Sequence, residues 1–236
     1  MTTAESIEHF CQYFERELQS IGRLIVAPVA AVDESEGGAF RYRKLLYVTD
    51  LDAMAKIRYE GKHYKNHKRF KLFVVEHGSW PEAELVSVPF LAAALKRCNR
   101  LGSVLGQHVS ARLAQFATED GGFPAAAMLD ERTADLLTLA RSKRDREAVE
   151  RCRHIDVLYR YRNFLVHESR EPGYGMDVTN SAESHYTSYI DDPLWHLVYP
   201  LPMFEALLRR SLASFRQWLT TNSVDPYSLI EEAERF

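Results

Sequence analysis

Apolar side chains recur at three- and four-residue steps along most of the chain, which predicts a mainly α-helical protein. The first run, over residues 7–21, predicts an N-terminal amphipathic helix. From Pro81 onward the same spacing predicts several long helices, ending with an amphipathic one over residues 204–219. The helix before that one should stop by Pro172, which places His167 in or near its last turn.

Three parts of the chain depart from helical spacing. The segments Leu24–Val32 and Phe40–Val48 are rich in valine, leucine and tyrosine and flank a turn with glycine, which predicts a β-hairpin. Residues 71–76 could form another strand, and aromatic residues within 186–199 predict short extended segments. The predicted fold is therefore mainly α, a helical bundle with minor β: this N-terminal hairpin and a short β segment between the last two long helices.

The length of 236 residues is enough for one large domain or two small ones. We expect a single domain over residues 1–236, in which residues 1–80 form a mixed α/β N-terminal extension and residues 81–220 form the helical core. The formal net charge is only −3, so bulk charge does not indicate nucleic-acid binding. A nucleic-acid partner would have to be held by local basic patches.

The three cysteines, Cys11, Cys98 and Cys152, are far apart in the chain. This indicates a reducing compartment and argues against a disulfide framework or a zinc finger. The N-terminus lacks the apolar centre of a secretory signal, and no stretch reaches the roughly 18 apolar residues that span a bilayer. We therefore expect a cytoplasmic protein with no membrane partner.

Residue types that suit RNA cleavage stand together at Arg162, Asn163 and His167, with three apolar residues before the histidine. A histidine can take the proton of a 2′-hydroxyl, and a guanidinium can hold the scissile phosphate. On a helix Asn163 shares a face with His167 and could orient the imidazole. Arg162 lies about 140° around the helix from His167, so its long side chain must close that gap. These three residues are the candidate catalytic group, and neither a metal nor another cofactor is expected.

The Arg–His spacing alone proves little, because about one such match is expected by chance in a chain of this composition. A second match, from Arg58 to His63, is interrupted by a glycine and is interpreted as accidental. The plain alternative for Arg162 and His167 is that they only decorate a helix C-terminus, where the helix dipole favours cations. The polar residue, the apolar interior and the position at a helix end favour the catalytic hypothesis.

With Asn163 directly after Arg162, and His167 four positions after Asn163, these residues resemble the signature of the HEPN superfamily. The resemblance implies a helical bundle that dimerises, so that two copies of the motif form one ribonuclease site. It also implies a toxin or an antiviral defence effector, with an antitoxin or a regulatory protein as a partner. Arg160, seven positions before the histidine, fits the looser spacing of the family. The resemblance covers only these residues, and residues 1–80 have no counterpart.

Residues 61–71 are the most basic short stretch, and Tyr64 and Phe70 are interleaved with the cations. Such a stretch can hold phosphates while an aromatic ring stacks on a base, although a solvated loop is the plain alternative. His63 and His67 have metal-ligand spacing on a helix, but no third ligand accompanies them, so no metal site is predicted. The candidate RNA-binding residues are the five cations of this stretch and one near the motif: Lys62, Lys65, Lys68, Arg69, Lys71 and Arg160.

The sequence thus predicts a metal-independent endoribonuclease of HEPN type that acts as a homodimer. It would cut single-stranded RNA by attack of the 2′-hydroxyl and leave a 2′,3′-cyclic phosphate. The alternative is a non-catalytic HEPN-like module that binds RNA or a protein. Asp50 and Asp52 resemble the carboxylate pair of a nucleotidyltransferase, and Gly78 and Ser79 resemble its glycine–serine turn. The two features stand in the reverse order along this chain, so we reject that interpretation and expect Asp50 to cap a helix.

Overall fold

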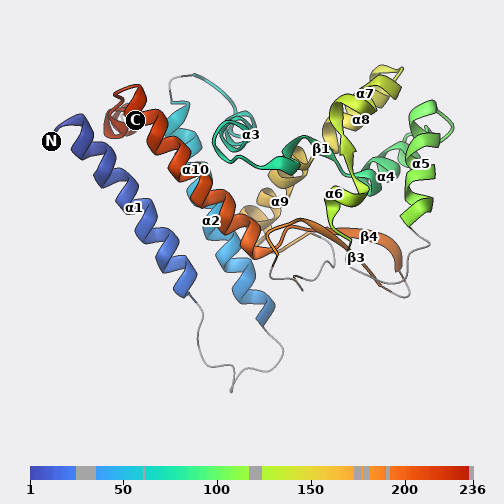
Figure 1. Ribbon diagram of the computed structural model, residues 1–236, viewed down its shortest axis with the longest axis horizontal. Helices are drawn as coiled ribbons and strands as arrows, with labels where there is room; N and C mark the ends of the chain where they lie inside the picture. Colours follow the sequence, from blue (N-terminus) through green and yellow to red (C-terminus); the bar gives the residue numbers. More distant parts are fainter. Residues whose placement is uncertain are drawn as a thin grey trace. The chain divides into compact units, whose positions relative to one another are not determined.

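A computed structural model describes residues 1–24, 36–60, 62–116, 124–172, 177, 181–189 and 192–233. Within these residues the chain is mainly helical with two small antiparallel sheets of two strands each (Figure 1), which confirms the predicted mainly α fold with minor β. Contacts divide the chain into one unit of residues 1–80, 162–171 and 201–236 and a second of residues 81–161 and 172–200. None of the helices in the described ranges has the length and apolar character needed to cross a membrane.

The first unit is a bundle of helices. In chain order it contains α1 (Thr3–Arg23), α2 (Glu36–Arg58), α3 (Asn66–His77), the C-terminal part of α9 (His154–Glu168), α10 (Leu201–Thr221) and α11 (Pro226–Ala233). The long helices α1, α2 and α10 lie side by side, and α3 packs on both α2 and α10 (Figure 1). Helix α10, which the sequence analysis placed in a core of residues 81–220, thus packs with the N-terminal helices.

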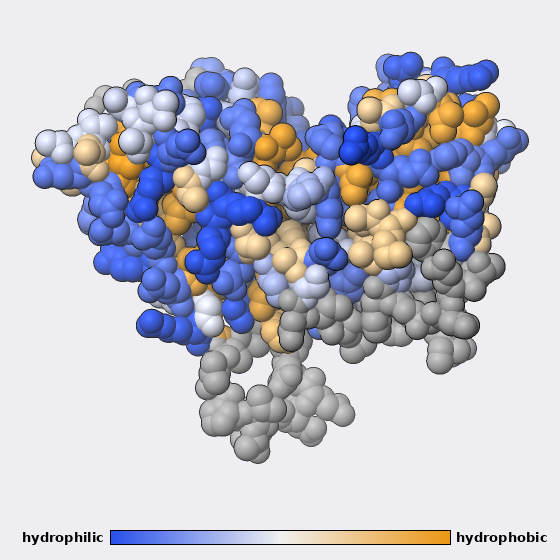
Figure 2. Space-filling view, in the orientation of Figure 1, coloured by the Kyte–Doolittle hydropathy of each residue, from blue (hydrophilic) through white to orange (hydrophobic). Residues whose placement is uncertain are grey.

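Helix α1 follows its sequence pattern closely. Thr2 is the N-cap: its hydroxyl accepts from the Glu5 amide, and the Glu5 carboxylate accepts from the Thr2 amide at 2.7 Å. Gly22 lies inside this helix, which ends at Arg23. Hydrophilic residues cover most of its outer surface (Figure 2). The predicted apolar face is confirmed as buried: Ile7, Phe10, Cys11, Phe14, Leu18 and Ile21.

The predicted N-terminal hairpin is wrong in its second strand, because Phe40–Val48 belongs to α2. Most of the first strand falls in residues 25–35, outside the described part. The strand predicted for residues 71–76 is also wrong, because these residues belong to α3. In both helices packing at helical steps overrides the β propensity of valine and tyrosine. The buried side chains that show this spacing are Lys44, Tyr47, Val48, Leu51, Met54 and Ala55 in α2, and Phe70, Phe73, Val74 and His77 in α3.

The second unit combines short helices with the two small sheets. It contains η2 (Pro81–Glu84), β1 (Leu85–Val86), α4 (Val88–Arg97), α5 (Val104–Phe116), α6 (Ala126–Leu129), β2 (Glu131–Arg132), α7 (Thr133–Leu139), α8 (Lys143–Arg151), the first part of α9, β3 (His185–Tyr189) and β4 (Asp192–Val198). Strand β1 pairs with β2, and β3 pairs with β4 with Tyr186 opposite Leu197. The β3–β4 pair confirms the β segment predicted between the last two long helices.

The helical spacing that began at Pro81 is divided between α4 and α5. Asn99 follows Cys98, the C-cap residue of α4, and has φ 53°, in the left-handed region. A Cβ on Gly106 would lie 2.5 Å from the carbonyl oxygen of Arg100, so this position in α5 needs glycine. Gly106 is therefore a point of close packing, and Gly102 lies in the connection between the helices.

Candidate functional site

The candidate site lies at the C-terminal end of α9, within the first unit. Helix α9 ends at Glu168, and Ser169 follows with φ 50°, so His167 lies in the last turn as predicted. The segment after the helix is tied to α2 by the fully buried Lys44, which donates to the Glu171 carboxylate at 2.9 Å. The motif residues are thus held at a helix end that is itself anchored to the bundle.

The guanidinium of Arg162 joins the three candidate catalytic residues. Its Nη1 donates to Oδ1 of Asn163 at 3.0 Å and to Nε2 of His167 at 3.3 Å. The long arginine side chain therefore closes the angular gap between positions 162 and 167. Because a guanidinium can only donate, Nε2 of His167 is an acceptor here, as in a neutral imidazole. The Asn163 amide binds the arginine and not the imidazole, which differs from the expected role.

A carboxylate that the sequence analysis did not assign to the site completes the group. Asp52 of α2 accepts from Nε of Arg162 at 2.5 Å, and Nη2 of Arg162 contacts the same oxygen. Burial raises the pKa of the Asp52 carboxyl above its ordinary value, while Arg162, Arg69 and His167 act in the opposite direction. A substrate phosphate that approaches Arg162 would therefore compete with Asp52 for the guanidinium.

A cavity of about 310 Å³ opens beside this group, with walls from α2, α3 and α9. Asp52 and Lys56 line it from α2, Arg69 lines it from α3, and Arg162 and Val166 line it from α9. Arg69, a predicted RNA-binding residue, is thus brought next to the catalytic candidates. His167 itself is exposed to solvent. The arrangement presents an accessible proton acceptor beside several cationic groups.

The other cations of the basic stretch take different positions. The Lys68 ammonium lies 3.8 Å from the centre of the Tyr64 ring, and the Lys62 ammonium lies 5.7 Å from that of Tyr59. Phe70 is fully buried, so the suggestion that it stacks on a base is wrong. An exposed Lys65 occupies the N-cap position of α3, and Lys71 within α3 is half-buried.

Arg160 belongs to the second unit, where its Nη2 donates to the carbonyl oxygen of Arg151 at 2.9 Å. The second Arg–His match does not form a similar group. Arg58 donates to the Glu76 carboxylate at 3.3 Å, and His63 lies beyond the end of α2. In the described ranges no cluster of three or more His, Cys, Asp or Glu side chains could hold a metal ion.

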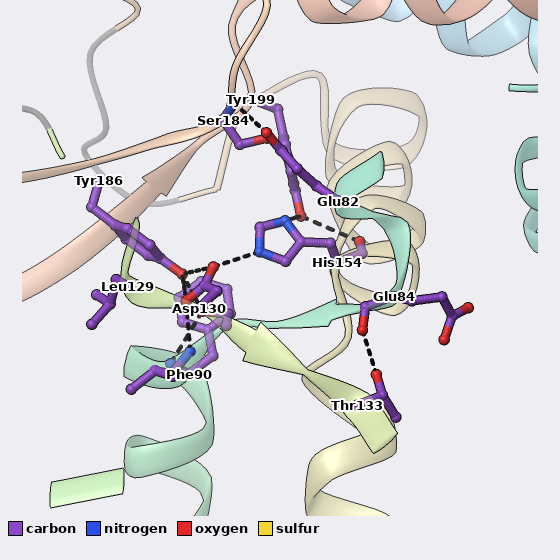
Figure 3. Close-up of polar contacts among 12 residues, drawn as sticks. Glu82, Glu84, Phe90, Leu129, Asp130, Thr133, His154, Ser184, Tyr186 and Tyr199 are labelled. Atoms are coloured by element: carbon purple, nitrogen blue, oxygen red, sulfur yellow. Dashed lines mark hydrogen bonds and ion pairs between the residues drawn. The ribbon is translucent and has the colours of Figure 1, made fainter. Parts of the chain in front are cut away.

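A second polar cluster, which the sequence analysis missed, is buried in the second unit (Figure 3). Asp130 bonds Nε2 of His154 at 2.6 Å and accepts from the Tyr186 hydroxyl at 2.8 Å. The Tyr199 hydroxyl lies 3.2 Å from Nδ1 of His154, and the Tyr186 hydroxyl also lies 2.7 Å from Oγ of Ser87. Serine, histidine and aspartate are catalytic residue types, but here each side chain is buried and bonded within the unit. This cluster stabilises the fold.

Of these missed residues, only Asp52 left a signal in the sequence. Thr49, Asp52, Ala53 and Lys56 recur at three- and four-residue steps, which gives one helix face with polar character next to the apolar face of α2. The members of the Asp130 cluster are distant in sequence and follow no local pattern. No family model, curated protein or solved structure matches the chain.

Proposed function

We propose that this protein is an endoribonuclease of HEPN type that cuts single-stranded RNA without a metal ion. The observation that carries the proposal is the Arg162 guanidinium, which bonds both Asn163 and the exposed His167 beside a cationic cavity. The proposal includes the antiviral defence or toxin role that the motif implies, with an antitoxin or regulatory protein as a partner.

The proposed reaction uses residues of two chains. His167 of one chain takes the proton of the 2′-hydroxyl, whose oxygen then forms a bond to phosphorus. The bond from phosphorus to the 5′-oxygen breaks, and that oxygen receives a proton from His167 of a second chain. Arg162 donates to the non-bridging oxygens, where charge accumulates. The products are a 2′,3′-cyclic phosphate and a 5′-hydroxyl, and the need for a second histidine makes a homodimer part of the proposal.

The experiment is cleavage of a labelled single-stranded RNA by the purified protein in EDTA. The wild type should produce fragments with a 5′-hydroxyl, which polynucleotide kinase labels without prior phosphatase treatment. His167→Ala should abolish cleavage while far-ultraviolet circular dichroism shows unchanged helicity. His63→Ala is the matched control, because it removes the histidine of the accidental match, and it should retain activity. Full activity of His167→Ala would refute the assignment. Expression of the wild type should slow growth of a host, and His167→Ala should relieve this.

A specific observation also favours the alternative, a non-catalytic module that binds RNA or a protein. The Asp52 carboxylate occupies two donor groups of Arg162, as expected of an arginine that only stabilises the bundle. Asp52→Asn separates the two functions. If Arg162 binds phosphate, removing the competing charge should tighten binding of a non-cleavable RNA. If Arg162 is structural, the variant should lose stability and leave RNA affinity unchanged.

A further inference from the structure

The cavity beside Arg162 has a cationic lining. Among the described residues that line it, Lys56, Arg69 and Arg162 carry positive charge and Asp52 carries negative charge. A cavity with more cations than anions attracts an anionic ligand. Its volume of about 310 Å³ is at the lower end of the range for small-molecule sites, which suits one phosphate with part of its sugar.

Arg69 is held in this cavity by a side-chain hydrogen bond. Its Nη2 donates to the Asn66 side chain at 2.5 Å, and both residues lie in the first turn of α3. Arg69 is half-buried, and it lines the cavity together with Asp52. A guanidinium held in place loses less conformational entropy when it binds a phosphate than a freely moving lysine does.

The N-terminus of α3 adds to the positive character of the cavity. Asn66 is the first residue of this twelve-residue helix and lines the cavity. The N-cap residue, Lys65, makes no side-chain hydrogen bond that caps the helix. The positive end of the helix dipole and the first-turn amides therefore reinforce the two cations at the same place.

We propose that this cavity is a second phosphate subsite, which holds the backbone phosphate adjacent to the scissile one. The inference rests on the proposed function, because it assigns the neighbouring scissile phosphate to Arg162. Arg69 binds the adjacent phosphate, Lys56 supports it, and Asn66 fixes the guanidinium. Since Arg162, Arg69 and Asp52 all line this one cavity, one RNA strand reaches the two subsites with consecutive phosphates. The ligand class is single-stranded RNA that is recognised by its backbone and not by its bases.

The test measures binding independently of cleavage. A short fluorescent RNA in which every 2′-hydroxyl is O-methylated cannot be cut by 2′-hydroxyl attack, and its Kd is measured by anisotropy across a series of salt concentrations. Arg69→Gln should raise the Kd roughly tenfold and reduce the slope of log affinity against log salt by about 0.7, the value for one lost phosphate contact on a single strand. Lys56→Gln should act in the same direction with a smaller effect.

Arg16→Gln is the matched control, because it removes one exposed arginine from α1 of the same unit. We expect Arg16→Gln to leave the Kd and the slope of log affinity against log salt nearly unchanged. Equal effects of Arg16→Gln and Arg69→Gln would overturn it, because binding would then depend on net charge alone. A second arm compares the RNA with and without a 5′-terminal phosphate, and an Arg69 effect confined to the phosphorylated RNA would overturn the assignment to an internal phosphate.

Failure of the subsite and failure of the proposed function give different results. Cleavage that depends on His167, together with RNA binding that is insensitive to Arg69→Gln, would overturn the subsite and leave the ribonuclease in place. Arg69-dependent binding by a wild type that cuts no RNA in EDTA would support a phosphate site at Arg69, and it would overturn the ribonuclease and the assignment of the neighbouring phosphate as the scissile one.

Discussion

Asp50 of α2 makes the stability of the protein depend on pH near neutrality. Its Oδ2 is buried and has no hydrogen-bond partner among the described atoms. Burial, with a further contribution from the negative charge of Glu17 on α1, raises the pKa of Asp50 from 3.8 to about 7. The sequence analysis interpreted Asp50 as a helix cap, but it lies in the interior of α2, where it caps nothing.

The sign of the effect follows from proton binding. Between pH 3.8 and pH 7 the folded protein keeps the proton on Asp50 while the unfolded chain has lost it. The free energy of unfolding therefore falls as the pH rises through this window, and the full loss is reached above about pH 7. A shift of about three pKa units corresponds to about 4 kcal/mol. Because the side chain is only half-buried, solvent screening reduces the expected loss to about 1–3 kcal/mol.

Asp50→Asn keeps the shape of the side chain and removes the ionisation. We expect the variant to be more stable than the wild type by about 1–3 kcal/mol at pH 8, and by less than half as much at about pH 5. The assay is urea unfolding followed by circular dichroism at both pH values. Glu183→Gln, which removes an exposed negative charge, is the control and should change stability by less than about 0.5 kcal/mol. A gain equal at both pH values, or a loss of stability at pH 8, would refute the reasoning.

Three further predictions concern the site and the buried cluster. Arg162→Lys keeps the charge, but an ammonium places its three donors on one nitrogen, whereas the Arg162 guanidinium contacts Asp52, Asn163 and His167 from three nitrogen atoms. We therefore expect kcat/KM for RNA to fall at least about tenfold. Inactive His167→Ala chains mixed in excess with wild type should lower the rate per wild-type chain, and an unchanged rate would argue against a site made by two chains. Tyr186→Phe leaves the buried Asp130 with one donor fewer and should lower the free energy of unfolding by about 1–3 kcal/mol in urea titrations.

The fold could be predicted where local pattern and packing agree. The apolar face of α1, the end of α9 before Pro172 and the β3–β4 pair were all recognisable from spacing and helix-stop signals. Helix α2 was not, because the valine, tyrosine and nearby glycine residues of 37–48 locally resemble a hairpin. What makes this segment helical is the contact of α2 with α3 and α10, and such contacts are not visible in a local window.

The site could be predicted as a set of residue types but not as a set of contacts. Arg162, Asn163 and His167 are within six positions of one another, so one helix end was enough to place them together. Asp52 reaches Arg162 across 110 positions, and no local rule predicts that pair. The basic stretch could be recognised in the sequence, but the different surroundings of its cations could not. Only Arg69 among them lines the cavity, whereas Lys62 and Lys68 lie over tyrosine rings.

The two histidines of α9 show why exposure, and not residue type, decides where the chemistry of this protein should be sought. His154 is fully buried and bonds Asp130 through one ring nitrogen and Tyr199 at the other, so its polar cluster has the composition of a catalytic site without access for a substrate. His167 is exposed, and its Nε2 accepts from an arginine that one carboxylate holds in place. Exchange of that carboxylate for a phosphate would bring RNA to a neutral imidazole, the form that can accept its 2′-hydroxyl proton.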